Sequence, residues 1–364
     1  MRMALLAPMA VLGLAVGCQH SSGPVEKGER AVTAKVSTGS PIDLQGAGAT
    51  FPYPLYSKWV TEYQKVDPRV RINYQSIGSG GGIRQITERT VDFGATDAPM
   101  TDTELAKAAG KLLHVPMTLG AIVVTYNLEG VQSLKLTPQA VAGIFLGEIK
   151  TWNDARIAES NPQTTLPGEP ITVVHRTDGS GTTAVFTEYL AGVSPQWNGK
   201  VGAGKSVNFP VGLGAKGNEG VAGQVKTTPG SIGYVEIAYA KQTGLAFAAI
   251  RNRAGKFVEP SLQSVTEAAA SVAETMSEDL RVSIVDAAGE AAYPISAFTY
   301  ILVYENQEDA VKGKAMAQFL WWAVHEGQRF GPPLQYAPLP AQVVSAVEGA
   351  LRGLRADGRP LLKE

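Results

Sequence analysis

Apolar and polar positions along the chain follow two different periods in turn. In residues 51–66 the apolar side chains recur every three or four positions, which predicts a helix beginning near Pro54. Residues 70–78 instead alternate between apolar and polar positions, which predicts a strand. The same two patterns then follow one another to the end of the chain, and this alternation is typical of an α/β protein.

The remaining elements can be placed in the same way. We expect strands or strand and hairpin segments at residues 91–99, 171–175, 230–242, 247–258 and 294–305, and residues 114–127 form a long apolar stretch. We expect helices at residues 81–90, 136–149, 182–192, 261–276, 308–327 and 339–354. The helix at 136–149 has Thr137 as its cap and Pro138 in its first turn. We expect Trp321 and Trp322, which follow a helical pattern, to belong to the core.

Composition narrows the possible partners. The chain has 364 residues, of which 44% are hydrophobic, so it can bury a large core and two domains are expected. Its formal net charge is -1, which gives no overall field to attract nucleic acid or an acidic membrane surface. Any anion site must therefore be built locally.

The N-terminal segment has the pattern of an export signal. An uncharged apolar run follows Arg2 and ends at Gly17 and Cys18, and it is too short to span a bilayer. Cys18 is the single cysteine, and this junction resembles a bacterial lipoprotein box. We therefore expect a signal peptide at residues 1–18, lipidation of Cys18 and a flexible tether at residues 19–41. The alternative is ordinary cleavage with an incidental or buried cysteine.

The segment "RTDGSGTT", residues 176–183, has the composition of an anion cradle. A predicted strand leads into Arg176, whose planar guanidinium suits an oxyanion, and a predicted helix follows Ser180 and Thr182. Helix N-termini carry unpaired amides and partial positive charge, so anions bind there. By itself the segment could equally be a polar loop with a capping hydroxyl.

Two other segments share this arrangement. Gly46, Gly48 and Thr50 precede one predicted helix, and Ser79 lies among glycines before another. Glycines allow the backbone to approach a ligand and to turn its amides toward it. Three such segments in one chain favour a single shared anion site.

Asp97 has the wrong charge for a simple anion pocket. An ionised carboxylate can only accept hydrogen bonds, so it tolerates a ligand oxygen only where that oxygen carries a proton. Hydrogen phosphate has such a proton and sulfate does not, so Asp97 is a candidate selectivity residue. The alternative is an aspartate that starts a turn before Pro99.

Eight segments together resemble the periplasmic phosphate-binding component of phosphate ABC transporters. They run in order over nearly the whole chain after the tether and occupy residues 46–59, 74–86, 91–100, 144–154, 176–183, 211–223, 230–241 and 294–303. The resemblance implies phosphate contacts from Thr50, the Phe51 amide, Ser79, Asp97, Arg176, Ser180, the Gly181 amide and Thr182. It also implies that Asp178 holds Arg176 in place. Gly80 departs from the pattern, because a second serine is expected there.

The resemblance also implies a fold and a setting. We expect an α/β periplasmic binding protein with one lobe formed by residues 42–116 and 295–364 and a second by residues 117–294. Two crossings between the lobes would form a hinge, and the cleft between them would close on phosphate. The expected partner is an ABC permease at the periplasmic face of the cell envelope, with a membrane anchor on Cys18. We expect a monomer without cofactor, metal, catalytic residue or nucleic-acid partner.

Two rival functions remain at this point. One is a secreted phosphatase or hydrolase that uses Ser180 as nucleophile, but no convincing base or metal set accompanies it, and we expect His175 to pack or cap. The other is a binding protein for another oxyanion such as sulfate, against which Asp97 argues. Residues 199–206, "GKVGAGKS", match the Walker A pattern, but no strand precedes them and Pro210 opposes a following helix.

Overall fold

The computed structural model describes residues 40–270, 277 and 279–362. The predicted signal peptide, Cys18 and the predicted tether as far as residue 39 lie outside these residues. The described chain is a single compact unit by its internal contacts.

The central element is a mixed sheet with strand order β2-β1-β3-β12-β4-β8-β6-β7, and β9 pairs with β4. Its strands are β1 (Ile42–Gly48), β2 (Val70–Ser76), β3 (Phe93–Thr96), β4 (Leu112–Asn127), β6 (Thr172–Arg176), β7 (Leu213–Ala215), β8 (Ser231–Glu236), β9 (Ala246–Phe247) and β12 (Ser296–Tyr304). Two small sheets are formed by β5 (Lys135–Leu136), β10 (Ala249–Arg251) and β11 (Phe257–Val258), and by β13 (Asn306–Gln307), β14 (Arg355–Ala356) and β15 (Arg359–Pro360).

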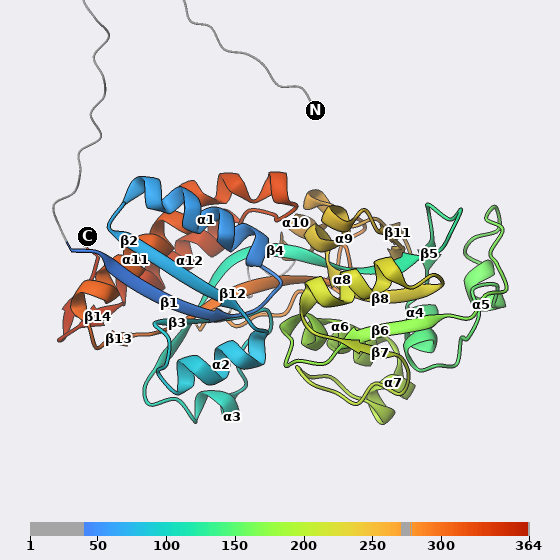
Figure 1. The fold of residues 1–364 in the computed structure, drawn as a ribbon, viewed down its shortest axis with the longest axis horizontal. Coiled ribbons are helices and arrows are strands. Elements are labelled where there is room, and N and C mark those ends of the chain that lie inside the picture. Colours follow the sequence, from blue (N-terminus) through green and yellow to red (C-terminus); the bar gives the residue numbers. More distant parts are fainter. Residues whose placement is uncertain (1–39, 271–276, 278, 363–364) are drawn as a thin grey trace, which may run out of the picture. The chain divides into compact units, whose positions relative to one another are not determined.

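Helices cover both faces of the central sheet (Figure 1). Around β1, β2 and β3 lie α1 (Tyr53–Val66), α2 (Ser79–Thr87), α3 (Asp102–Leu105), α11 (Ala310–Val324) and α12 (Ala341–Arg352). Around β6 and β8 lie α4 (Pro138–Phe145), α6 (Gly181–Val193), α7 (Pro195–Lys200), α8 (Gly217–Thr227) and α9 (Ile237–Thr243), and α10 (Leu262–Ala270) packs against β4 and β12. The short elements are α5 (Ala155–Ala158) and the 3-10 turns η2 (Glu326–Phe330) and η3 (Pro332–Leu334).

Strand β4 joins the two halves of the sheet. Its residues 112–121 pair antiparallel with β12, and its residues 122–127 pair antiparallel with β8. At the change of partner, the Ile122 amide donates to the Ile295 carbonyl at 2.8 Å, just before β12 begins. The chain therefore passes between the two halves along two adjacent segments, as the sequence predicted.

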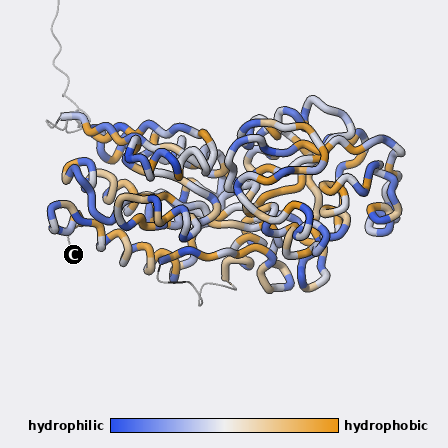
Figure 2. The backbone as a smooth tube through the Cα atoms, turned by 90° about the horizontal axis from the view of Figure 1, so that it is seen from below, coloured by the Kyte–Doolittle hydropathy of each residue, from blue (hydrophilic) through white to orange (hydrophobic). Residues whose placement is uncertain are grey.

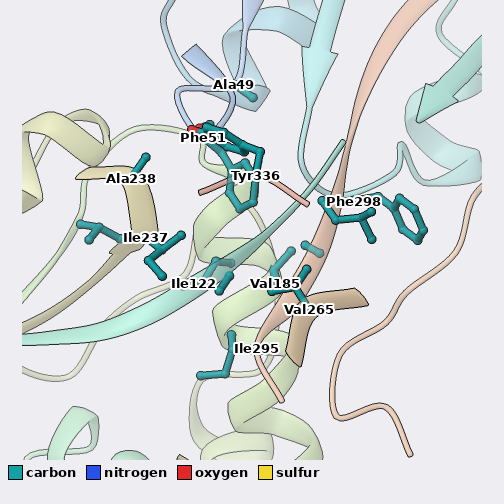
Figure 3. Close-up of a cluster of buried hydrophobic side chains, with 14 of the residues drawn as sticks. Ala49, Phe51, Ile122, Val185, Ile237, Ala238, Val265, Ile295, Phe298 and Tyr336 are labelled. Atoms are coloured by element: carbon teal, nitrogen blue, oxygen red, sulfur yellow. The ribbon is translucent and has the colours of Figure 1, made fainter. Parts of the chain in front are cut away.

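One hydrophobic core runs through both halves. Figure 2 shows apolar stretches of the backbone in both halves, alternating with polar ones. Figure 3 shows part of this core, where Phe51, Ile122, Ile237 and Tyr336 come together from distant parts of the sequence. All four are at most 2% exposed. Burial of such side chains stabilises the fold by about 25 cal/mol per Å² of apolar surface. The core thus fixes the segments that carry the candidate site.

Most predicted elements are confirmed, with two corrections. Residues 230–242 are not strand throughout, because β8 ends at Glu236 and α9 follows. The Glu236 carboxylate accepts the Ala238 amide at 2.9 Å and so caps that helix. The predicted core position of Trp322 is confirmed, but Trp321 is only partly buried and stacks on His325.

Candidate functional site

The predicted site residues follow strand ends or open helices. Thr50 and Phe51 follow β1, Ser79 opens α2, and Asp97 follows β3. Arg176 ends β6, and residues 180–182 form the start of α6. The side chains predicted to form the site are all at most 5% exposed: Thr50, Phe51, Ser79, Asp97, Arg176, Ser180 and Thr182. Polar groups buried to this degree require hydrogen-bond partners, so their contacts indicate which groups remain available to a ligand.

The start of α6 packs directly against the loops of the other half of the sheet. The Gly181 amide donates to Ser79 Oγ at 3.0 Å, and the Gly80 amide donates to the Gly179 carbonyl at 2.8 Å. Asp97 Oδ2 lies 3.5 Å from Ser79 Oγ. These contacts bring two of the glycine-rich segments together beside Asp97, and the third joins them where the Gly78 amide donates to the Gly48 carbonyl at 2.8 Å.

Arg176 is held by Asp178 through two parallel hydrogen bonds. Arg176 Nε donates to Asp178 Oδ1 at 2.8 Å, and Nη2 donates to Oδ2 at 2.5 Å. Burial, the largest influence, raises the pKa of Asp178, but the hydrogen bonds and charge of Arg176 together with the Gly217 amide bring it below its usual value. Arg176 Nη1 is buried and has no hydrogen-bond partner among the described residues. A buried guanidinium with one free donor end is suited to an anion.

The surroundings of Asp97 stabilise a negative charge much less than those of Asp178 do. Burial raises the pKa of the Asp97 carboxyl to about 7, and the Thr299 hydroxyl, the charge of Arg176 and the hydroxyls of Ser79 and Thr182 only partly oppose that effect. Thr299 donates to Asp97 Oδ1 at 3.0 Å. Near neutral pH this carboxyl can therefore accept or donate a hydrogen bond according to its partner.

Ser180 acts as the cap of α6. Its Oγ accepts the Thr183 amide at 3.0 Å, and its own amide donates to the Lys205 carbonyl at 2.8 Å. His175, the nearest histidine in sequence, stacks on Phe209 with ring centroids 4.5 Å apart. Ser180 therefore has the contacts of a helix cap rather than those of an activated nucleophile.

Residues 199–206, which match the Walker A pattern, form an ion pair instead of a phosphate-binding loop. Residues 201–212 contain no helix. Lys205 Nζ donates to Glu104 Oε2 at 2.9 Å and to the Pro99 carbonyl at 3.2 Å. Lys205 thus joins the loop beside Ser180 to the turn that follows Asp97, and the motif has no phosphate-loop geometry.

Over the described parts of the chain, no three side chains of His, Cys, Asp or Glu form a group that could hold a metal ion. The same part of the chain contains no helix with the length and apolarity needed to cross a bilayer.

Comparisons with known proteins identify the family of this chain. The model of the PBP superfamily domain matches residues 35–326. The phosphate-binding protein PstS of Xylella fastidiosa is 43% identical over 331 residues, which cover 90% of each chain. PstS of Pasteurella multocida is 45% identical over 307 residues, covering 84% of this chain and 88% of its own. This chain belongs to the PstS family of phosphate-binding proteins.

A solved structure shows the same fold. The high affinity periplasmic phosphate-binding protein PfluDING, solved with bound phosphate, aligns with a TM-score of 0.67 at 22% identity. The alignment covers 85% of this chain and 93% of that chain. The predicted two-lobed α/β fold of periplasmic binding proteins is therefore confirmed.

Gly80, where a serine was expected from the family pattern, has a packing role in this chain. A β-carbon at position 80 would lie 3.1 Å from Gly179 Cα, tighter than ordinary contact. The two glycines therefore allow the backbones of residues 80 and 179 to meet across the site. The sequence suggested only a missing hydroxyl, whereas the structure shows a close approach of two backbones.

Asn218 and Glu236 also belong to this neighbourhood, and the sequence reasoning gave neither a role. Asn218 is fully buried and contacts both Thr50 and Thr182. Glu236 is fully buried, and burial raises its pKa well above the usual value. The signal for Asn218 was available, because the stretch "GLGAKGN" at residues 212–218 repeats the glycine-rich approach to a helix seen before α2 and α6.

Proposed function

We propose that this chain binds inorganic phosphate in the buried site between the two halves of its sheet and delivers it to an ABC permease for import. The observation that carries this proposal is that one buried site contains both a cationic guanidinium and an acidic carboxyl. Arg176 offers a guanidinium nitrogen that has no hydrogen-bond partner in the part of the chain that the structure describes, and Asp97 offers a carboxyl. Hydrogen phosphate, which has both anionic oxygens and a proton, satisfies both groups.

Each predicted residue has a distinct task in this account. Arg176 binds the negative oxygens, and Asp178 fixes its orientation. The amides of Phe51 and Gly181 and the hydroxyls of Thr50, Ser79, Ser180 and Thr182 provide the surrounding donors, and the Gly181 amide exchanges its bond to Ser79 Oγ for one to the ligand. Fixed donors replace the water that the ligand loses, and the start of α6 adds the favourable field of a helix N-terminus.

Asp97 provides the selectivity. When ionised it accepts the proton of hydrogen phosphate. Sulfate, which has no proton, would place an oxygen lone pair against the carboxylate, and that repulsion weakens binding. The site therefore recognises the proton of the ligand as well as its charge.

The movement that we propose follows from the chain path. Residues 42–116 with 295–364 form one lobe, and residues 117–294 form the other. The hinge lies near β4 and the segment before β12. Ligand contacts from both lobes stabilise the closed state selectively, as a population shift requires. The closed protein is a periplasmic monomer, tethered to the membrane through lipidated Cys18, and the permease recognises it.

Calorimetric titration of the purified, ligand-free protein with phosphate and then with sulfate tests this function, together with an assay for phosphate-ester turnover. We expect one phosphate per chain, much weaker sulfate binding and no turnover. Turnover would favour the hydrolase that uses Ser180. A preference for sulfate would keep the anion site and contradict the role of Asp97.

A further inference from the structure

Asn218 forms three hydrogen bonds through its side-chain amide, which fix that amide in one orientation, and a fourth through its backbone N–H. Its side chain is fully buried at the start of α8. The backbone N–H of Glu236 can only donate, and it faces Asn218 Oδ1 at 2.9 Å. The oxygen of the amide must therefore point to Glu236, which leaves Nδ2 and its two hydrogens for the opposite side.

Both of those hydrogens are directed at hydroxyls of the phosphate site. Asn218 Nδ2 lies 2.7 Å from Thr50 Oγ1 and 3.1 Å from Thr182 Oγ1. The backbone amide of Asn218 also donates to Thr50 Oγ1 at 3.2 Å. A single residue thus links a threonine that follows β1 to a threonine in the first turn of α6.

These bonds determine what the Thr50 hydroxyl can do. A hydroxyl has two lone pairs and one hydrogen, and Thr50 Oγ1 already accepts two hydrogen bonds from Asn218. Its remaining capacity is to donate. The Thr50 backbone is fixed as well, since its carbonyl accepts the Tyr239 hydroxyl at 2.5 Å.

We infer that Asn218 is a positioning residue of the phosphate site, which sets the Thr50 hydroxyl as a donor, holds the Thr182 hydroxyl beside it and joins the two lobes in the closed state. This inference rests on the proposed function, because the donors are useful only to an anion. Phosphate oxygens are acceptors, so a hydroxyl prevented from accepting is already oriented for them. Asn218 need not touch the ligand to act in this way.

Asn218→Asp is the sharpest test, because it keeps the oxygen that faces Glu236 and replaces Nδ2 with an acceptor. The new carboxylate turns the threonine hydroxyls toward itself and adds negative charge beside the ligand. We expect phosphate affinity to fall by about 100-fold or more, since hydrogen bonds to charged groups are among the stronger ones. The far-ultraviolet circular dichroism spectrum should remain that of the wild type.

Asn252 provides a matched control. It is also a buried asparagine whose Nδ2 donates to backbone carbonyls, those of Gly289, Glu290 and Ala292, and whose Oδ1 accepts the Lys256 amide. Asn252→Asp should lower the melting temperature of the ligand-free protein and leave phosphate affinity unchanged. A purely structural role for Asn218 predicts the same behaviour for both variants.

A double-mutant cycle distinguishes positioning from general destabilisation even where Asn218→Asp does not fold. Asn218→Ala, Thr50→Val and the double variant are compared for phosphate affinity. Because Asn218 acts partly through the Thr50 hydroxyl, the double variant should lose less affinity than the product of the two single losses.

The outcomes separate the two proposals. A wild-type protein that does not bind phosphate overturns the proposed function. A wild-type protein that binds phosphate, with Asn218→Asp at equal affinity or with independent losses in the cycle, overturns the positioning role alone.

Discussion

Gly181 faces Asp97 so closely that a β-carbon at position 181 would lie 2.6 Å from Asp97 Oδ2 and 2.5 Å from Ser79 Oγ. The contact joins the first residue of α6 to the turn after β3. These two segments belong to different halves of the protein. Only a glycine permits this approach. The absence of a side chain at this position is thus part of the site.

Gly181→Ala should therefore weaken phosphate binding. The added methyl group must displace Asp97 and Ser79 or hold the lobes apart, and overpacking of this kind costs about 1–3 kcal/mol. If the closed state bears that cost, affinity falls roughly 5- to 150-fold, which calorimetry measures directly.

Gly192→Ala is the control in the same helix, because a β-carbon at position 192 meets no atom of the described residues within 4 Å. It should leave phosphate affinity unchanged and stabilise α6 slightly. Equal affinities for Gly181→Ala and the wild type would contradict the close approach of α6 to Asp97.

Asp97→Asn should reduce discrimination against sulfate more than it reduces phosphate binding. The amide can donate to an unprotonated oxygen, and its own oxygen can still accept the proton of hydrogen phosphate. We expect the ratio of sulfate to phosphate dissociation constants to fall by about 10- to 100-fold, the range of a charge-assisted hydrogen bond. Competition titrations measure this ratio, with Asp43→Asn at an exposed ion pair as control. Unchanged competition by sulfate would remove Asp97 from selectivity.

The pH dependence of sulfate binding tests the same carboxyl without a mutation. The pKa of Asp97 is raised to about 7, so the carboxyl carries a proton below that pH and can donate to sulfate. Sulfate affinity should therefore fall as the pH rises through 7, by up to about tenfold per pH unit. The Asp97→Asn variant should lack this dependence, and a wild-type sulfate affinity that is constant from pH 6 to 8 would contradict the protonation argument.

The raised pKa of Asp97 also makes the stability of the ligand-free protein depend on pH. Because the folded-state pKa of Asp97 is raised, its contribution to the free energy of unfolding is fully present below the unfolded value, about 4. That contribution is lost as the pH rises through about 7. Asp97→Asn should remove this part of the pH dependence in thermal unfolding of the ligand-free protein.

Cys18→Ser tests the membrane anchor. If the cysteine is lipidated, the wild-type protein sediments with bacterial membranes and the variant appears in the soluble periplasmic fraction. Mass spectrometry of the N-terminal peptide identifies the lipid. A wild-type protein found wholly in the soluble fraction would leave only the alternative of ordinary signal cleavage.

Local patterns in the sequence were sufficient for most of the fold. The apolar stretch at residues 114–127 lies within β4, and the predicted Thr137 cap accepts the Ala140 amide at 3.1 Å. The pattern failed at residues 237–243, where apolar residues suited to a strand form α9. The cause is the Glu236 cap, a side-chain contact with its own following backbone that periodicity does not reveal.

The candidate site was predictable in its polar segments and unpredictable in its tertiary contacts. Arg176 and Ser180 are recognisable because they flank a glycine before a helix. The contact of Gly80 with Gly179 and the bonds of Asn218 with Thr50 join residues about 100 or more positions apart. Such contacts depend on the packing of the whole sheet. The glycine-rich stretch before Asn218 marks the start of a helix but does not identify the residues that Asn218 contacts.

A crystal structure of the protein grown with phosphate is the most direct test of the central claim. We predict one phosphate that contacts Arg176 Nη1, Asp97 and the Gly181 amide, with Thr50 Oγ1 donating to it and the Asn218 bonds retained. Phosphate bound at another place, or bound without Asp97 and Arg176, would contradict the account.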